Sequence, residues 1–426
     1  MNPSTQKMGF NATWSMAVGG MVGGGIFSTL GVVIGISGAL AWLSFLVAGV
    51  IALAAGYSYV KLTRHYGKGG GAFTFLRKIG AMQSAGPLAW VLIVDYVLTN
   101  AVYAYTFGQY LAHVAGFGGV FARSAAVGIM AVFIGLNLRS IGQSSGVEIL
   151  LVWFKLVVLV ALSVIGLAHW EPQMLARGAP DAGIGTALFG AAAVFMAYEG
   201  FQLLAYDYED IADADRTLPR AVLSAIAVVI VVYVMVALGT PMLIGADGVI
   251  GNQEVALALA GEKAMGKAGL VIVTVAAAFS TGSAINSTLF ATARLAREVT
   301  QKGELPLAVD HENRFGIPDR AVIVLGALAA LFAAIGTLSN LVEAASLAFL
   351  CTFAIVGGLA FHAGAGSRIL TGFGAASSAA AALALIDRLW RTSPLALVMF
   401  AVLLLVAIFG RPWLLRHVET QAPSED

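Results

Sequence analysis

The sequence has few charged residues and almost no cysteine. Only 11% of its 426 residues are charged, whereas soluble domains carry about 25%. Because 59% of the residues are hydrophobic and so few charges cannot cover a water-facing surface, the sequence predicts an integral membrane protein. The net charge of +1 excludes a strongly basic nucleic-acid binder. A single cysteine, Cys351, excludes a disulfide framework and a cysteine metal site.

Other absences narrow the function further. The sequence has no histidine pair and no cluster of metal ligands, so we expect neither an enzyme nor a bound cofactor or metal. No polar stretch is long enough for a separate soluble domain. The first apolar run is long and follows a short polar tail, so we expect no cleavable signal peptide.

Apolar runs long enough to cross a bilayer as helices recur from end to end of the sequence. We therefore predict an all-α membrane protein with 12 transmembrane helices. The predicted spans are residues 12–36, 39–62, 84–114, 121–138, 146–168, 182–206, 219–243, 268–295, 320–336, 338–362, 369–386 and 393–410.

Lysine and arginine are distributed unevenly between the two sets of loops. With a cytoplasmic N-terminus, 17 of the 24 cations fall on the cytoplasmic side and 6 outside, and Lys155 lies within a span. Positive residues accumulate on the cytoplasmic side of membrane proteins. The distribution therefore predicts a multi-pass protein of the cytoplasmic membrane with both tails, 1–11 and 411–426, in the cytoplasm.

Two spans contain residues that interrupt a helix. The stretch GGMVGGGIF, residues 19–27, puts five glycines in the first span, and Glu199 and Gly200 lie in the sixth. Glycine-interrupted segments at matching positions of two halves point to a transporter binding site. We therefore expect broken helices 1 and 6 in two inverted repeats of five spans. The predicted parts are a first repeat, 12–168, a second repeat, 182–362, and two additional spans, 369–410.

The glycine run has two interpretations. If the helix opens at Val22, Gly23, Gly24, Gly25 and Ile26, the free N–H groups of the following half-helix carry partial positive charge and suit a substrate carboxylate. The carbonyls before the opening would then suit an ammonium group. The alternative is close helix packing through small residues, which is common in membranes.

The interruption in the sixth span places a carboxylate beside aromatic residues. Glu199 could recognise a cationic group, relay a proton, or cap the second half of the helix. Tyr198 and Phe201 flank it and could close over a substrate or present an aromatic face to a cation. The aromatic residues expected near this site are Phe27, Tyr96, Tyr103, Phe195, Tyr198 and Phe201.

Two further ionisable residues lie inside predicted spans. A lysine at a helix centre costs about 2.5–3.5 kcal/mol on insertion scales, so Lys155 is a candidate proton carrier, or a structural cation that holds the carbonyls of a broken helix. Asp95 lies in the third span and could pair with Lys155 or with Asn100. We group Asp95 with Lys155 as a candidate for proton coupling.

A polar stripe in the eighth span offers a different cation site. Ser280, Ser283 and Ser287 share one helix face at i, i+3 and i+7. Their hydroxyls could ligate sodium, or they could form hydrogen bonds between helices. Because Lys155 offers an internal cation, we favour the hydrogen-bonding interpretation.

Four segments in sequence order resemble motifs of one transporter family. GGMVGGGIF resembles the first-span signature of the amino acid–polyamine–organocation transporters, and the other three segments resemble its first cytoplasmic loop, its sixth span with the following loop, and its eighth span with the following loop. One departure is Glu199, which stands where many amino acid permeases have an aliphatic residue. The other three segments are GKGGGAFTFLRKIG (67–80), MAYEGFQLLAYDYEDIADADRTLPRAV (196–222) and FSTGSAINSTLFATARLAREVTQKGELP (279–306).

The resemblance implies a LeuT-like fold with five-plus-five inverted repeats. It implies substrate contacts to the backbone from Gly23 to Ile26 and to the sixth-span break at Phe195, Tyr198 and Glu199. It also matches Lys155 to a lysine of proton-coupled members that contacts the backbone at the position of Gly19.

We therefore expect a proton-coupled symporter that imports an amino acid or a related amine by alternating access. Its expected partners are the small-molecule substrate, the proton and the lipid bilayer, with no nucleic acid. One alternative is a carrier of polyamines, simple amines or inorganic cations with Glu199 as counter-charge. Sodium coupling through Ser280 and Ser283 is a second, and a channel or a non-transporting membrane sensor is a third.

Overall fold

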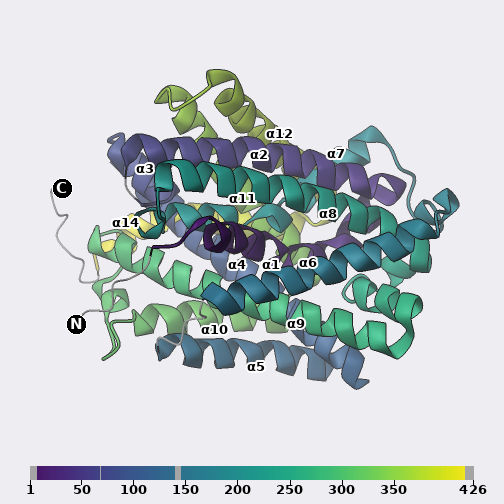
Figure 1. Cartoon of the computed structure of the whole chain (residues 1–426). Helices are drawn as coiled ribbons and strands as arrows, with labels where there is room; N and C mark the ends of the chain where they lie inside the picture. Colours follow the sequence, from purple (N-terminus) through teal and green to yellow (C-terminus); the bar gives the residue numbers. More distant parts are fainter. Residues whose placement is uncertain (1–6, 68, 140–144, 418–426) are drawn as a thin grey trace.

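The computed structural model describes residues 7–67, 69–139 and 145–417 (Figure 1). The regular secondary structure of these ranges is helical, with two isolated β-bridges, Met8 with Ile211 and Glu312 with Pro318. The helices of ten or more residues are α1 (Phe10–Ser37), α2 (Ala41–Tyr66), α4 (Met82–Ala115), α5 (Gly119–Leu138), α6 (Ser145–Ala168), α7 (Ile184–Ala193), α8 (Ala214–Gly251), α9 (Ala256–Gln301), α10 (Asp319–Ile335), α11 (Leu338–His362), α12 (Arg368–Thr392) and α13 (Pro394–Leu405). Short helices are α3 (Ala72–Lys78), α14 (Arg411–Leu415), η1 (Gly38–Leu40), η2 (Pro172–Leu175), η3 (Phe195–Tyr198), η4 (Phe201–Ala205), η5 (Tyr208–Asp210), η6 (Leu307–Asp310) and η7 (Val406–Gly410).

Each predicted span coincides with helical structure. Among the described residues, 8 helical stretches are long and apolar enough to cross a membrane, and one of them contains both α1 and α2. The count of 12 spans and their division into inverted repeats stay predictions. The helices α8 and α9 exceed their predicted spans, because each contains a glycine with positive φ, Gly245 (φ 72°) and Gly266 (φ 63°), at which the chain turns.

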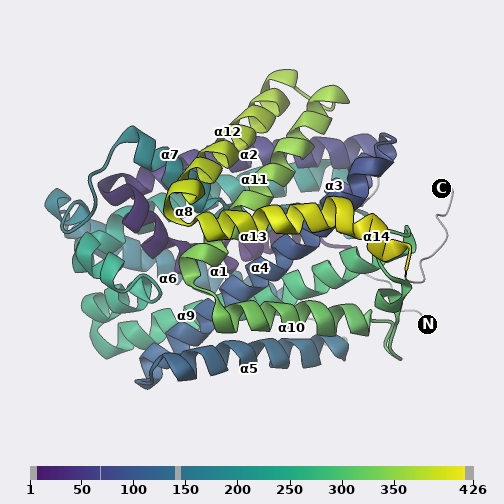
Figure 2. The same cartoon turned by 180° about the vertical axis from the view of Figure 1, so that it is seen from behind.

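Helices α1 and α4 form the centre of the bundle. Helix α1 contacts α4, α6, α8 and α9 as well as η3 and η4. In the most apolar window of α4, 78% of residues are buried, against 17% in α5, which lies at the edge (Figure 2). The core of the molecule therefore lies where α1, α4 and the segment between α7 and α8 meet.

The two ends of the bundle differ in what they carry. Helix α1 begins at the end that also carries α3 and α14, which we call the α3 end (Figures 1 and 2). At this end a short parallel bridge ties the chain before α1 to the segment after η5, through hydrogen bonds from Met8 N to Asp210 O (2.8 Å) and from Ala212 N to Met8 O (2.9 Å). The opposite end carries the turn between α8 and α9.

Candidate functional site

The chain between α7 and α8 departs from an α-helix in the middle of the bundle. Helix α7 ends at Ala193 and is followed by η3, an extended Glu199 (ψ 152°) and Gly200 with φ 123°. Only glycine adopts such a φ without strain. The break predicted at Glu199 and Gly200 is therefore present, and the whole of this segment from Phe195 to Gln202 is buried.

Glu199 is held in place by two side chains. The hydroxyl of Tyr103 donates to Glu199 Oε2 (3.1 Å), and the amide of Gln202 donates to Oε1 (2.8 Å). Gln202 in turn accepts a hydrogen bond from Gly200 N (2.8 Å). A buried carboxylate is stable only when its oxygens have such partners. Described residues supply no cation here, so the charge of Glu199 is satisfied by hydrogen bonds and not by an ion pair.

The predicted break in the first span is wrong. Helix α1 runs without interruption from Phe10 to Ser37, so the amides from Gly23 to Ile26 lie within a continuous helix and are not presented at a helix N-terminus. The carbonyls of the two residues before this stretch accept hydrogen bonds from neighbouring helices. Tyr233 of α8 donates to Met21 O (2.7 Å), and Ser280 of α9 donates to Val22 O.

The physical reason is that the glycines serve close packing. A Cβ on Gly20 would lie 2.8 Å from the Cα of Gly200, and one on Gly23 would lie 2.6 Å from the Cβ of Ala284 in α9. A Cβ on Gly24 would collide with the ring of Tyr103 in α4. Gly25 is packed in the same way, because a Cβ there would lie 2.7 Å from both Ala197 O and Tyr233 Oη. The second interpretation of the glycine run, packing through small residues, therefore describes this structure.

Lys155 lies buried on α6 and reaches α1. Its Nζ donates to the carbonyl of Gly19 (3.1 Å), the contact that the family resemblance implied. Gly19 is the neighbour of Gly20, which touches the break at Gly200. Lys155 and the broken segment therefore contact adjacent residues of the same helix.

Asp95 forms no hydrogen bond or ion pair with Lys155 or Asn100. Neither of its carboxylate oxygens has a hydrogen-bond partner among the described residues, although the side chain is fully buried. Asn100 instead donates to the carbonyl of Tyr96 (3.0 Å).

The serine stripe divides between two roles. Ser280 is buried and bonds to α1, whereas Ser287 donates to the carbonyl of Ser283 (3.1 Å) within its own helix. Hydroxyls of one helix that bond to the carbonyls of another match the interpretation that we favoured. In the part of the chain that the structure describes, no group of His, Cys, Asp and Glu could hold a metal ion.

The aromatic side chains of the break contact helices α2 and α11. The hydroxyl of Tyr198 donates to the carbonyl of Phe45 in α2 (2.7 Å). Phe195 and Phe201 each lie with their ring centres 5.5 Å from that of Phe353 in α11. The structure thus groups them with α2 and α11, and it brings Tyr103 of α4 to Glu199 in their place.

Sequence reasoning did not single out Gln202, Tyr233 or Glu148. Gln202 follows Glu199 by three residues, a spacing that places two side chains together in a helical turn. Tyr233 donates both to Met21 O and to Ala197 O (2.9 Å), and so ties α1 to the break. No pattern in the sequence marks it among the apolar residues of its span.

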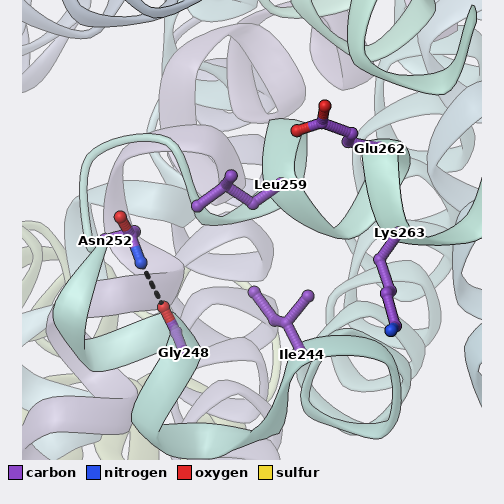
Figure 3. A pocket seen from close by; sticks show the side chains of 6 residues that line it. All are labelled: Ile244, Gly248, Asn252, Leu259, Glu262 and Lys263. Atoms are coloured by element: carbon purple, nitrogen blue, oxygen red, sulfur yellow. Dashed lines mark hydrogen bonds between the residues drawn. The ribbon is translucent and has the colours of Figure 1, made fainter. Parts of the chain in front are cut away.

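A surface cavity lies away from all of these residues. Its volume is about 460 Å³, and it lies where α8 ends and α9 begins (Figure 3). The side chain of Asn252 donates to Gly248 O (3.0 Å) at its rim. No predicted site residue lines it, so it is separate from the broken segment. The lining residues are Ile244, Gly248, Asn252, Leu259, Glu262 and Lys263.

Comparisons with known proteins agree with this architecture. The family profile for amino acid permeases matches residues 8–418. The chain is 27% identical to the inner membrane transport protein YbaT of Escherichia coli, over 83% of each chain. It is 26% identical to the serine/threonine exchanger SteT of Bacillus subtilis, over 72% of this chain and 71% of that protein. The crystal structure of MhsT in complex with L-phenylalanine has the same fold, with a TM-score of 0.62 at 15% identity, covering 94% of this chain and 98% of that one.

Proposed function

The chain belongs to the amino acid permease family, and from that premise we propose that it imports an amino acid or a related amine together with a proton. As a member it is a multi-pass membrane transporter and not an enzyme, and its fold is LeuT-like. The proton coupling, the direction of transport and the cytoplasmic location of both termini are part of the proposal.

One observation supports the coupling most directly. Lys155 and Gly200 contact Gly19 and Gly20, which are adjacent on α1. A change in the charge of Lys155 therefore acts on Gly19, and the broken segment packs against the next residue, Gly20. Coupling needs only that protonation favours one state of the carrier over the other.

The substrate would bind where α1 and the broken segment meet. Glu199 would receive the ammonium group, with Tyr103 and Gln202 orienting the carboxylate. Phe195, Tyr198 and Phe201 would form the walls behind the break. The serine/threonine substrate in the name of SteT supports an amino acid.

The test is uptake into proteoliposomes with an imposed pH gradient. We expect the gradient to drive accumulation of a radiolabelled mixture of L-amino acids, and Lys155→Ala to abolish it while substrate exchange persists. The control is Lys263→Ala, because Lys263 is an exposed lysine of α9 that should be dispensable. Full gradient-driven accumulation by Lys155→Ala would show that the coupling role is wrong.

The same assay separates the alternatives. Accumulation that needs a sodium gradient and is lost in Ser280→Ala and Ser283→Ala would show that sodium, and not the proton, is the coupling ion. Uptake restricted to polyamines, simple amines or inorganic cations would assign Glu199 as their counter-charge. Currents far above the turnover of a carrier would indicate a channel, and binding without flux would indicate a sensor.

A further inference from the structure

Helix α6 carries a second ionisable residue on the face that bears Lys155. Glu148, Val152 and Lys155 follow one another at i, i+4 and i+7, which places them on one side of the helix. Glu148 is half-buried in the first turn, at the α3 end, while Lys155 is buried about two turns deeper. The face therefore leads from the interior to one end of the bundle.

Both side chains converge on one residue of α1. Lys155 Nζ bonds to Gly19 O, and a Cβ built on Gly19 would lie 3.3 Å from Glu148 Oε1 and 3.2 Å from Val152 Cγ2. Glycine at this position thus leaves room for the carboxylate beside the backbone that Lys155 contacts. The stacked rings of Trp14 and Trp153, 5.6 Å apart, hold α1 and α6 together beside this point.

The charges around Glu148 continue toward the end of the bundle. Lys155 on its own helix attracts its carboxylate, and Asp207, on the segment that follows the break, repels it. Asp207 is paired with Arg294 of α9 (2.8 Å), whose side chain is exposed. Lys155 is buried, Glu148 is half-buried, and the side chain of Arg294 in the pair with Asp207 is exposed, so exposure to water increases in that order.

We propose that Glu148 is the residue through which Lys155 exchanges its proton with water at the α3 end. The inference rests on the proposed proton coupling and names its exit path. The ammonium of Lys155 transfers a proton, by way of one intervening water, to the carboxylate of Glu148, which yields a neutral amine and a carboxylic acid. The acid then releases the proton to water beside Asp207 and Arg294.

The physical advantage of this path is that its first step creates no lone charge at membrane depth. An ammonium and a carboxylate become two neutral groups in the first step, so no uncompensated ion is created at membrane depth. Without Glu148 the proton would have to leave Lys155 past Val152, which is buried and apolar. We therefore expect the residue to govern the rate of proton exchange and not the binding of substrate.

The test compares proton movement with substrate exchange in the same proteoliposomes. An inward gradient of mixed L-amino acids should acidify liposomes that contain a pH-sensitive dye, and radiolabelled amino acids should also exchange by counterflow. Glu148→Gln should slow acidification by about a hundredfold and flatten its pH dependence, with counterflow near the wild-type rate. Glu148→Asp should restore much of the acidification, and Glu171→Gln, at an exposed glutamate, should leave both rates unchanged.

Three results would overturn the inference, and they are distinguishable. If Glu148→Gln acidifies like the wild type while Lys155→Ala does not, coupling stands and Glu148 has no part in it. A parallel loss of counterflow, acidification and thermal stability in both Glu148 variants would assign it a structural role at the helix start. If the wild type moves no protons at all, the proposed function itself fails.

Discussion

Glu199 is the side chain on which the choice of substrate depends most directly. Its carboxylate is buried and accepts hydrogen bonds from Tyr103 and Gln202, and none of the residues that the structure describes forms an ion pair with it. A substrate ammonium would supply the missing positive charge, in a charge-assisted hydrogen bond of about 1.5–3 kcal/mol. An amino acid that also binds through its carboxylate depends on this bond less than a simple amine does.

We therefore predict that Glu199→Gln separates the two substrate classes. Binding of a cationic probe such as putrescine should weaken by roughly 10- to 100-fold, while a neutral amino acid such as L-serine should still be carried. Radiolabelled uptake into proteoliposomes measures both, with Glu262→Gln, at an exposed residue of α9, as the control. Equal losses for both probes would show that Glu199 supports the fold of the break and does not discriminate between substrates.

Single residues could be predicted only where burial or resemblance constrained them. Lys155 and Glu199 stand out because a charge within an apolar span is costly. The contact of Lys155 with Gly19 followed from the resemblance and is present. The partners of Asp95 could not be predicted, because which side of α4 faces the break depends on helix rotation, and Tyr103 of that helix reaches Glu199 instead.

At the scale of elements, glycine has different structural effects in α1 and in the segment after α7. In the segment after α7, Gly200 adopts a φ of 123°, which ends a helix. In α1 every glycine of the run keeps helical geometry, because α4, α6, α8, α9 and the broken segment press against it. Helix propensity predicts a break in both places, and tertiary packing decides between them, so the sequence alone could identify only one.

The packing role of α1 predicts a loss of stability in Gly24→Ala. The added methyl would collide with the ring of Tyr103, which is itself buried and bonded to Glu199. Overpacking of this kind costs about 1–3 kcal/mol, so the melting temperature in detergent should fall. The matched control is Gly128→Ala in α5, where the methyl meets open space and alanine gains up to about 1 kcal/mol of helix propensity.

An unchanged or higher melting temperature for Gly24→Ala would contradict this account of the glycine run. It would mean that α1 and Tyr103 separate easily, as expected of a surface built to open for a substrate. Uptake measured on the same variant shows whether the opening is used in transport.

At the scale of the whole molecule, the apolar runs predict where the helices lie in the sequence, but they do not predict which helices contact one another. Hydrophobicity and length identify a span, and the predicted boundaries of the seventh and eighth spans lie within two residues of the turns at Gly245 and Gly266. The contacts of α1 with α4, α8 and α9 join residues far apart in the sequence. They depend on side-chain shapes in three dimensions, which no periodicity encodes.

The charge distribution predicts which end of the bundle faces the cytoplasm, and a pair of exposed glutamines can test it. Gln83 begins α4 at the α3 end, and Gln173 lies in η2 at the other end of the bundle. Because positive residues stay in the cytoplasm, a membrane-impermeant maleimide should label Gln173→Cys in intact cells and Gln83→Cys only after permeabilisation. The single native cysteine, Cys351, is first replaced by alanine, and this background is the unlabelled control. The reverse labelling pattern would show that the protein has the opposite orientation in the membrane. Glu148 would then lie on the outer side, where it would accept incoming protons instead of releasing them.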